Sequence, residues 1–292
     1  MRPLPTFRLH RPETLGEALE LLGSLEGARP IAGGTDLLVL LRDGAIQARH
    51  LVDLGRVEEL RYIREEDGAI RIGAATTHAQ LIGSELVAAK APVLQEAAAF
   101  MGSVQTRNTG TLGGNLCNAS PAADTAPPLL VLGAELTVTA LEGPRSIPLG
   151  ELFAGPKMNS LGPGELLTEI RFPAPPLGSG ASFHKLGRRR GFTLSVVNAA
   201  AYLEVDGGIC RGARVAIGAV AATPLRMTAV ERMLEGEKLS RLLMEEAASA
   251  CRGLVEPIDD VRASAEYRRE MSRVLARRAL IDAWGRAGRS PR

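Results

Sequence analysis

The sequence predicts an α+β fold, in which a small βαβ unit precedes a mainly antiparallel α/β part and a C-terminal α+β domain. Three observations support this prediction. Residues 29–54 have the pattern of strand, glycine turn, helix and strand. Hairpin turn signals follow at residues 66–68 and 206–208. A segment rich in Pro and Gly, residues 172–180, separates the last domain from the rest.

Composition and charge are those of an ordinary globular protein. With 292 residues the chain is long enough for about two domains. A net charge of +2 and an aromatic content of 3% argue against nucleic acid as a partner. The chain opens without a secretory signal, its apolar runs are too short to span a membrane, and its three scattered cysteines fit a reducing compartment. We therefore expect a soluble, cytoplasmic protein without a metal site.

In the N-terminal part, capping and periodicity predict each element. Thr14 and Glu17 form a capping box ahead of an amphipathic helix. A strand is expected at residues 29–32, a helix at 36–42 and a strand at 50–54. The glycine turn between the first strand and the helix thus lies at a helix N-terminus, where anions are favoured.

Further along the chain, the pattern changes to hairpins and broken helices. Strands are expected at residues 61–65, 69–74, 135–141, 166–172, 181–186, 193–205 and 209–220. A helical stretch at residues 77–101 is expected to break near Gly83 and Pro92. The last helix begins near Ser264 and is predicted to bury one apolar face, formed by Tyr267, Met271, Val274, Leu275 and Ala279.

These elements give a domain division. We expect a first domain at residues 1–173 with subdomains of about 1–56 and 57–173, a linker at 174–180, a C-terminal domain at 181–285 and a disordered tail at 286–292. Residues 262–292 contain nine arginines and three acidic residues. We expect that face to meet an acidic partner or solvent.

Two glycine-rich turns carry the functional prediction. Residues 31–38 have the sequence IAGGTDLL, and residues 108–115 have the sequence NTGTLGGN. Paired glycines let backbone N–H groups approach an anion without an intervening side chain, and Thr35 and Thr111 add hydroxyl donors. Two such turns suit a ligand with a central pyrophosphate, most plausibly FAD. The alternative is that each glycine pair only makes a tight turn.

These segments together resemble the FAD-binding (medium) subunit of the molybdenum hydroxylase family, the carbon monoxide dehydrogenase and xanthine dehydrogenase type. The resemblance lies in residues 32–36, 111–115, 117–124, 183–185 and 266–269, and it covers nearly the whole chain. It implies a PCMH-type FAD-binding fold, with FAD held by the first domain and the C-terminal domain packed alongside.

The motifs and the resemblance together suggest cofactor-binding roles for Ile31, Ala32, Gly33, Gly34, Thr35, Asp36, Leu37, Met101, Gly110, Thr111, Gly113, Gly114, Asn115, Asp124, Leu166, Leu167 and Lys185. The glycines are assigned to backbone approach on the pyrophosphate, and Asn115 to fixing the second loop or touching a phosphate. The Asp36 carboxylate would repel a pyrophosphate, so we expect it to turn away and hold its loop or cap the helix.

Five positions are implied to lie near the flavin nucleotide. Asp124 would accept a hydrogen bond from a hydroxyl or ring N–H group of the nucleotide, or else cap the following helix. Met101, Leu166 and Leu167 would surround the ring system, or else pack in the core. Lys185 would favour the anionic reduced flavin, or else be a surface lysine.

The resemblance implies electron transfer without a catalytic acid or base from this chain. A large partner subunit would carry molybdopterin and oxidise the substrate, and a small one would carry two 2Fe–2S clusters. Electrons would leave through FAD to NAD⁺, O₂ or a quinone, in a complex that is plausibly a dimer of heterotrimers. The alternatives are a self-contained PCMH-fold flavin oxidoreductase and a non-catalytic scaffold that has lost FAD. The sequence does not identify the substrate or the acceptor.

Overall fold

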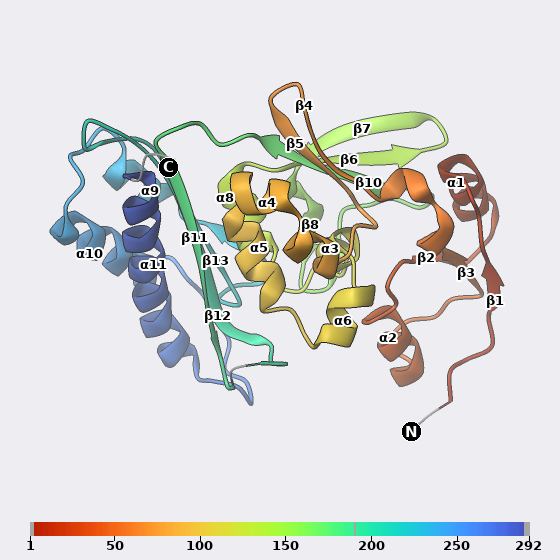
Figure 1. The fold of residues 1–292 in the computed structure, drawn as a ribbon. Coiled ribbons are helices and arrows are strands. Elements are labelled where there is room, and N and C mark those ends of the chain that lie inside the picture. The colour runs from red at the N-terminus through yellow and green to blue at the C-terminus, as the bar shows by residue number, and fades with distance from the viewer. Residues whose placement is uncertain (1–2, 190, 289–292) are drawn as a thin grey trace.

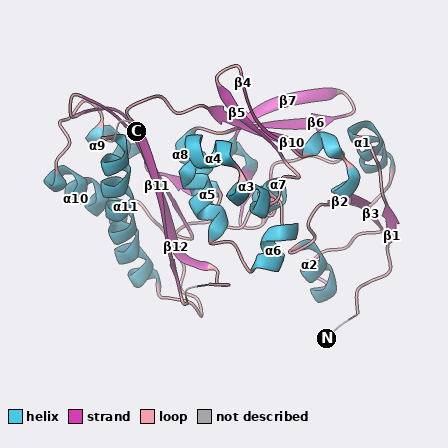
Figure 2. Cartoon of the chain, viewed as in Figure 1, coloured by secondary structure: helices cyan, strands magenta, loops and turns pink. Residues whose placement is uncertain are grey.

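Three larger β-sheets, each from a different stretch of the chain, organise the described residues, 3–189 and 191–288. The structure is a computed structural model. Figure 1 shows the sheets following one another from the red N-terminal part, through the yellow and green central part, to the blue C-terminal part. Helices accompany every sheet (Figure 2), which is the mixed architecture that the sequence predicts.

The N-terminal sheet has the strand order β1–β3–β2, with parallel pairing throughout. Its part of the chain contains β1 (Arg8–His10), α1 (Leu15–Ser24), β2 (Ala28–Ile31), α2 (Leu37–Asp43) and β3 (His50–Asp53). The expected βαβ unit is therefore confirmed as β2–α2–β3. Strand β1 lies outside that prediction, because its three residues are too few to show an alternating pattern.

Helix α1 begins where its capping residues predict. The hydroxyl group of Thr14 accepts a hydrogen bond from the N–H of Glu17 at 3.2 Å. The Glu17 carboxylate reaches back to the N–H of Glu13 at 2.9 Å, one residue before the expected partner. A hydroxyl cap of this kind contributes about 1 kcal/mol to helix stability.

The central sheet is antiparallel, with the order β4–β5–β10–β6–β7. Its strands are β4 (Ile63–Glu66), β5 (Ala69–Gly73), β6 (Glu135–Ala140), β7 (Gly143–Pro148) and β10 (Leu166–Pro173). The turn between β4 and β5 places Asp67 and Gly68 at φ values of 52° and 72°, which confirms the predicted hairpin. Short elements complete this part: η1 (Leu54–Arg56), η2 (Glu58–Leu60), η3 (Leu149–Leu152), β8 (Phe153–Gly155) and β9 (Met158–Asn159).

Helices pack against the central sheet and bury the main apolar core with it. They are α3 (His78–Gly83), α4 (Glu85–Lys90), α5 (Pro92–Ala99), α7 (Leu112–Cys117) and α8 (Ala126–Leu132). Helix α6 (Val104–Thr109) belongs to the same part of the chain but buries none of its residues. The helical stretch expected at residues 77–101 is broken where predicted, because α3 ends at Gly83 and Pro92 opens α5. Helix α6 lies beside α2 in Figure 1, which brings the two glycine turns to the same side of the molecule.

The C-terminal sheet is antiparallel, with the order β11–β12–β13–β14. Its part of the chain contains β11 (Ser179–Gly187), β12 (Ser195–Asp206), β13 (Ile209–Gly218), β14 (Leu225–Arg226), α9 (Thr228–Leu234), α10 (Arg241–Ala250), η4 (Cys251–Gly253) and α11 (Ala265–Ala287). Helix α11 packs directly on the sheet (Figure 1), so closely that a Cβ atom at Gly180 would lie 2.2 Å from the carbonyl oxygen of Ala283.

The buried face of α11 differs from the predicted one. The helix buries Arg268, Ser272, Leu275, Ala276, Ala279, Leu280, Ala283 and Ala287. Leu275 and Ala279 were predicted correctly, but Tyr267 is 48% exposed. The face is rotated because buried Arg268 donates to Asp260 at 2.7 Å and to the carbonyl oxygen of Ala219 at 2.9 Å. Small alanines then let the helix approach the strands.

Two expectations about the C-terminal end change. Helix α11 continues through Ala287, so it includes the first two residues of the expected disordered tail, while residues 289–292 lie outside the described part. Several arginines of this helix pair with acids of the same chain, since Arg273 contacts Glu245 and Glu270. The arginine-rich face is thus partly neutralised internally. Within the described ranges, no helix has both the length and the apolarity that crossing a bilayer requires.

Candidate cofactor-binding site

The two glycine-rich turns lie against each other. A Cβ atom at Gly33 would stand 2.0 Å from the carbonyl oxygen of Thr109 and 2.8 Å from the Cα of Gly110. A Cβ atom at Gly110 would lie 3.5 Å from the hydroxyl oxygen of Thr35. Segments that are more than seventy residues apart in the chain therefore form one continuous surface. Gly33 is required by this contact because no side chain fits between the two backbones.

The first loop presents a run of unpaired backbone donors. Among the described residues, the N–H groups of Gly33, Gly34, Thr35 and Asp36 have no hydrogen-bond acceptor. Gly34 adopts a φ of 67°, a left-handed conformation that favours glycine. These donors lie just before and at the N-terminus of α2, where the helix dipole is positive. This arrangement suits a phosphate group.

Asp36 occupies the N-cap position of α2 but does not cap it. Its side chain accepts no hydrogen bond from the helix, and its φ and ψ of −103° and −46° are not the extended values from which side chains cap. The carboxylate instead lies 4.0 Å from the ammonium group of Lys157. The expected helix cap is therefore wrong, and the ion pair reaches a different segment rather than the loop of Asp36 itself.

Lys157 brings a further segment to the two loops. It occupies the turn between β8 and β9 in a left-handed conformation with a φ of 61°. Its N–H donates to the carbonyl oxygen of Ala119 at 2.9 Å, and Ala119 is itself left-handed with a φ of 46°. Asn159 adds a second bond, from Nδ2 to the carbonyl oxygen of Cys117 at 2.7 Å. The hairpin is thereby fixed beside the segment that follows the second loop.

The second loop has fewer free donors than the first. The N–H groups of Leu112 and Gly113 donate to the carbonyl oxygens of Thr76 and Ala74, at 2.9 Å each. A Cβ atom at Gly113 would lie 2.7 Å from the Cβ of Ala74, so this glycine is needed for packing whether or not a ligand binds. Gly114 is exposed, and its N–H donates to the hydroxyl oxygen of Thr111 at 3.1 Å.

Thr111 retains a donor that points to a role at this surface. Its oxygen accepts from Gly114 and caps α7, so its hydroxyl hydrogen stays available for another acceptor. Thr35 is exposed, and its hydroxyl oxygen would lie 3.5 Å from a Cβ atom at Gly110, the residue before Thr111. One exposed and one buried threonine therefore lie close to the point at which the loops meet.

Asn115 connects the second loop with Asp124. Its Oδ1 accepts a hydrogen bond from the hydroxyl group of Thr125 at 2.6 Å. Thr125 precedes α8 directly and holds the N-cap position of that helix. Asp124 is therefore not the cap, and this alternative for its role is excluded. The expected role of Asn115 in fixing the loop agrees with the bond to Thr125.

Asp124 and Lys185 form a buried ion pair between the central and C-terminal parts of the chain. The Lys185 Nζ lies 2.6 Å from Asp124 Oδ2, and the two side chains are 4% and 6% exposed. Nζ also donates to the carbonyl oxygen of Phe100 at 3.3 Å. The other carboxylate oxygen, Oδ1, accepts from Ser195 Oγ at 2.5 Å and from Asn198 Nδ2 at 2.8 Å. Lys185 is thus not a free surface lysine.

A hollow of about 370 Å³ opens beside Lys185. It is lined by Phe100, Lys185, Leu186, Gly187, Arg189, Gly191 and Thr193. Leu166 and Leu167 do not line it, because their side chains pack in two separate apolar cores. Met101 is half-buried beside Phe100, and its carbonyl oxygen accepts from Arg107 at 3.0 Å. For the two leucines, the structure thus displays the core packing that the sequence left as an alternative.

The remaining predicted residues support the first loop. Ile31 ends β2, and its Cδ1 would lie 3.1 Å from a Cβ atom at Gly34. Ala32 and Leu37 are half-buried at the two ends of the loop. Their side chains pack locally and leave the loop backbone as the surface that a ligand would meet.

Two titratable side chains near the loops, His78 and Cys117, are uncharged at pH 7. Burial, with a smaller effect of nearby Arg107, lowers the pKa of His78 to about 4, so its imidazole is neutral at pH 7. Burial raises the pKa of the Cys117 thiol to about 12, which keeps it protonated. This agrees with the interpretation of Cys117 as a packing residue rather than a nucleophile.

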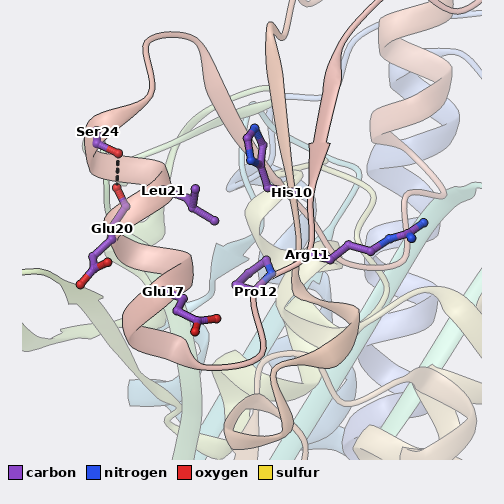
Figure 3. Close-up of a pocket in the computed structure, with 7 residues that line it drawn as sticks. All are labelled: His10, Arg11, Pro12, Glu17, Glu20, Leu21 and Ser24. Carbon is purple, nitrogen blue, oxygen red and sulfur yellow. Dashed lines mark hydrogen bonds between the residues drawn. The ribbon is translucent and has the colours of Figure 1, made fainter.

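A second hollow, of about 400 Å³, lies along α1 and away from this site (Figure 3). It is lined by His10, Arg11, Pro12, Glu17, Glu20, Leu21 and Ser24. It mixes one arginine with two carboxylates, and it contains none of the predicted cofactor-binding residues. Nothing in its lining resembles a dinucleotide site.

The contacts form one unbroken path from the first loop to Lys185. Gly33 meets Thr109, the second loop follows, Asn115 reaches Thr125, and adjacent Asp124 binds Lys185. At one end are unpaired amides and hydroxyl donors, which suit a diphosphate. At the other end are a cation and a hollow partly lined by Phe100. An elongated ligand with a diphosphate and a flat ring, such as FAD, fits this order of groups.

Three residues of the candidate site were not identified from the sequence. Lys157 sits in an unremarkable Gly-Pro-Lys turn, while Ser195 and Asn198 lie in a strand that otherwise looks apolar. The signal for the last two was present, since polar side chains inside a buried strand need partners. Their partner, Asp124, is more than seventy residues away, which only the fold reveals.

Two family models match the chain. Residues 5–175 match the FAD binding domain in molybdopterin dehydrogenase, and residues 181–283 match the CO dehydrogenase flavoprotein C-terminal domain. The sequence is 38% identical over 283 residues to the carbon monoxide dehydrogenase medium chain of Afipia carboxidovorans, covering 97% of this chain and 98% of that one.

Other relatives agree. A putative xanthine dehydrogenase FAD-binding subunit of Escherichia coli is 34% identical over 281 residues, covering 96% of each chain. Among solved structures, carbon monoxide dehydrogenase from Hydrogenophaga pseudoflava superposes with a TM-score of 0.94 at 36% identity, covering 97% of this chain and 99% of that one. The likeness therefore extends over both parts of the fold.

Proposed function

The chain belongs to the family of FAD-binding subunits of molybdenum hydroxylases, and we propose that it is the flavoprotein subunit of such an oxidoreductase complex. The observation that carries this proposal furthest is the contact between the two glycine-rich turns, with a run of unpaired N–H groups at one side of it. Bound FAD would supply the redox chemistry, accepting electrons and releasing them to an acceptor.

The residues of this chain bind and orient that cofactor. The N–H groups of Gly33–Asp36 donate to the diphosphate, and the hydroxyl groups of Thr35 and Thr111 donate beside Gly110. Lys157 lies 4.0 Å from Asp36 and partly offsets the repulsion that this carboxylate would exert on a phosphate. Ile31, Ala32 and Leu37 support the first loop, Gly113, Gly114 and Asn115 the second, and Met101 lies next to the hollow.

At the other end, Lys185 holds a positive charge beside the hollow. A cation near the ring would stabilise the reduced, anionic form of the flavin and so raise its reduction potential. Asp124 keeps that cation in place rather than acting alone on the nucleotide. Leu166 and Leu167 contribute only by packing in the two separate apolar cores.

The partners follow from the family. A large molybdopterin-binding subunit oxidises the substrate, and a small subunit with 2Fe–2S clusters delivers the electrons. We propose a dimer of heterotrimers in the cytoplasm, with NAD⁺, O₂ or a quinone as acceptor. No catalytic acid or base of this chain is needed for electron transfer.

One experiment separates this proposal from a self-contained flavin oxidoreductase and from a scaffold without flavin. The full chain is purified alone and in its complex, and the released chromophore is identified. The proposal expects FAD in both preparations, and substrate-driven bleaching only in the complex. Bleaching by a small substrate without partners would support the self-contained enzyme, and a colourless complex would support the scaffold.

A further inference from the structure

We propose that Ser195 and Asn198 are positioning residues for the cofactor, which act through Asp124 to hold the Lys185 ammonium group at the flavin site. The inference rests on the proposed function, because a bound flavin is what this cation would influence. Neither residue belongs to the glycine-rich turns or lines the hollow beside Lys185.

Both oxygens of the Asp124 carboxylate have partners from neighbouring strands. One Asp124 oxygen takes two neutral donors from β12, and the other takes the cation from β11. Ser195 is 1% exposed and Asn198 is fully buried, so water does not replace these donors. A buried carboxylate is tolerated only when it is paired and hydrogen-bonded, and here the protein provides both.

The strands are arranged to make room for Asn198. It pairs with Gly218 on β13, where a Cβ atom would lie 2.2 Å from Asn198 Oδ1. Within the part of the chain that the structure describes, that buried Oδ1 has no hydrogen-bond partner. An apolar residue would avoid leaving this oxygen unpaired, so packing alone does not explain an asparagine. Its useful atom is Nδ2, which donates to Asp124.

The residue after Gly218 also helps to fix the segment that carries Asp124. Ala219 adopts a left-handed φ of 65°, which is unfavourable for a residue with a side chain. Its N–H donates to the carbonyl oxygen of Pro121 at 2.7 Å, three residues before Asp124. The strained residue thus fixes the segment that carries Asp124 against the same strands that carry Ser195 and Asn198.

Removing the Ser195 or the Asn198 donor changes the electrostatic environment of Asp124 and Lys185. The Asp124 carboxylate loses a donor that fixes its orientation, so the Lys185 ammonium group, which lies between Asp124 and the carbonyl oxygen of Phe100, loses its fixed position. The Lys185 ammonium group then moves from this position, and its stabilisation of the reduced flavin weakens. Reduced flavin should lose affinity relative to oxidised flavin, which is equivalent to a lower reduction potential.

The test compares Ser195→Ala and Asn198→Ala with the wild type, using the full chain in its complex. Reduction potential and FAD affinity are measured for each. We expect the ratio of affinities for reduced and oxidised flavin to fall at least about tenfold, or about 30 mV for a two-electron couple. Ser195→Cys should resemble Ser195→Ala, because a thiol keeps the volume but donates weakly.

Ser182→Ala is the matched control. Ser182 is a buried serine on the neighbouring strand β11, and its hydroxyl donates at 2.8 Å to the carbonyl oxygen of Ala279, remote from Asp124. Its potential should equal that of the wild type. If Ser195→Ala fails to fold, Ser195→Cys gives the answer.

Two results would overturn the inference. An unchanged potential in both Ser195→Cys and Asn198→Ala would show that the donors do not act on the flavin. An equal shift in Ser182→Ala would assign the effect to general loosening of the sheet. A wild-type complex without FAD would refute the proposed function as well, whereas FAD in the wild type with unshifted variants would refute this inference alone.

Discussion

Gly33 lies against the carbonyl group of Thr109, with no space between the two backbones for a side chain: a Cβ atom would stand 2.0 Å from that oxygen. This contact joins the two glycine-rich turns into one surface. It also changes the meaning of the first glycine pair. Gly33 lets one loop meet the other, while the N–H groups from Gly33 to Asp36 find no acceptor among the residues that the structure describes.

Gly33→Ala should separate the loops. The added methyl group meets backbone, which cannot rotate away, so we expect a loss of about 1–3 kcal/mol in stability and weaker FAD binding. Thermal unfolding and FAD titration measure the two effects. Gly285→Ala is the control, because its Cβ would meet no atom within 4 Å and a helical alanine gains up to about 1 kcal/mol. Normal FAD affinity in Gly33→Ala would contradict the joint surface.

Lys185→Met should destabilise the protein even without cofactor. It leaves the Asp124 carboxylate buried without its cation, a loss of about 3–5 kcal/mol for pairs of this kind. Adding Asp124→Asn should restore part of the loss, because the buried charge disappears. Urea unfolding of the single and double variants measures both. A single variant as stable as the wild type would show that the pair is not buried in solution.

Stability should fall between pH 6.5 and pH 4 because of His78. Its pKa is lowered to about 4 in the folded chain, against about 6.5 when unfolded, so only the unfolded chain takes up the proton in this window. The shift corresponds to at most about 3 kcal/mol. The Glu165 carboxylate titrates lower, since Arg145 holds its pKa at about 2.

The measurement for His78 is urea unfolding at pH 4.5 and pH 7, for the wild type and for His78→Leu. The variant should lose less stability on acidification, because leucine takes up no proton in either state. Parallel pH profiles for the two proteins would show that His78 is not the group responsible.

Arg268 and Arg269 should differ sharply although they are neighbours. Arg268 is 4% exposed and bonds Asp260 and two carbonyl oxygens, so Arg268→Met should cost about 3 kcal/mol or more. Arg269 is 39% exposed and pairs loosely with Glu266 at 3.7 Å, so Arg269→Met should change stability by less than about 0.5 kcal/mol. Similar losses in both variants, measured by chemical unfolding, would contradict the assigned burial.

Local chemistry was enough to predict much of the fold. The Thr14 cap, the turn at Asp67 and Gly68, and the breaks at Gly83 and Pro92 each depend on neighbours in sequence. The first loop was located correctly as a turn ahead of a helix. The second glycine-rich segment, predicted as a turn, lies largely in α6 and α7, two helices that were not predicted from the sequence.

What the sequence hid depends on distant partners. The face of α11 was misplaced because Arg268 looks like a surface residue until Asp260 and the carbonyl oxygens of Val196 and Ala219 enclose it. The same holds for Ser195 and Asn198, whose acceptor lies in another part of the chain. The apolar periodicity of a sequence does not reveal a charged residue that is buried together with its hydrogen-bonding partners.

The central claim is that the first loop, seated on the second, binds the diphosphate of FAD. The most direct measurement is the affinity of the full chain for FAD and for riboflavin, which lacks the diphosphate, in Thr35→Asp and Thr35→Asn. Thr35 is exposed, so neither variant disturbs packing. The account predicts that Thr35→Asp weakens FAD at least about tenfold, or 1.4 kcal/mol, by charge repulsion, with riboflavin unchanged and Thr35→Asn much less affected. Equal affinity of Thr35→Asp and wild type for FAD, or an equal loss for riboflavin, would contradict it.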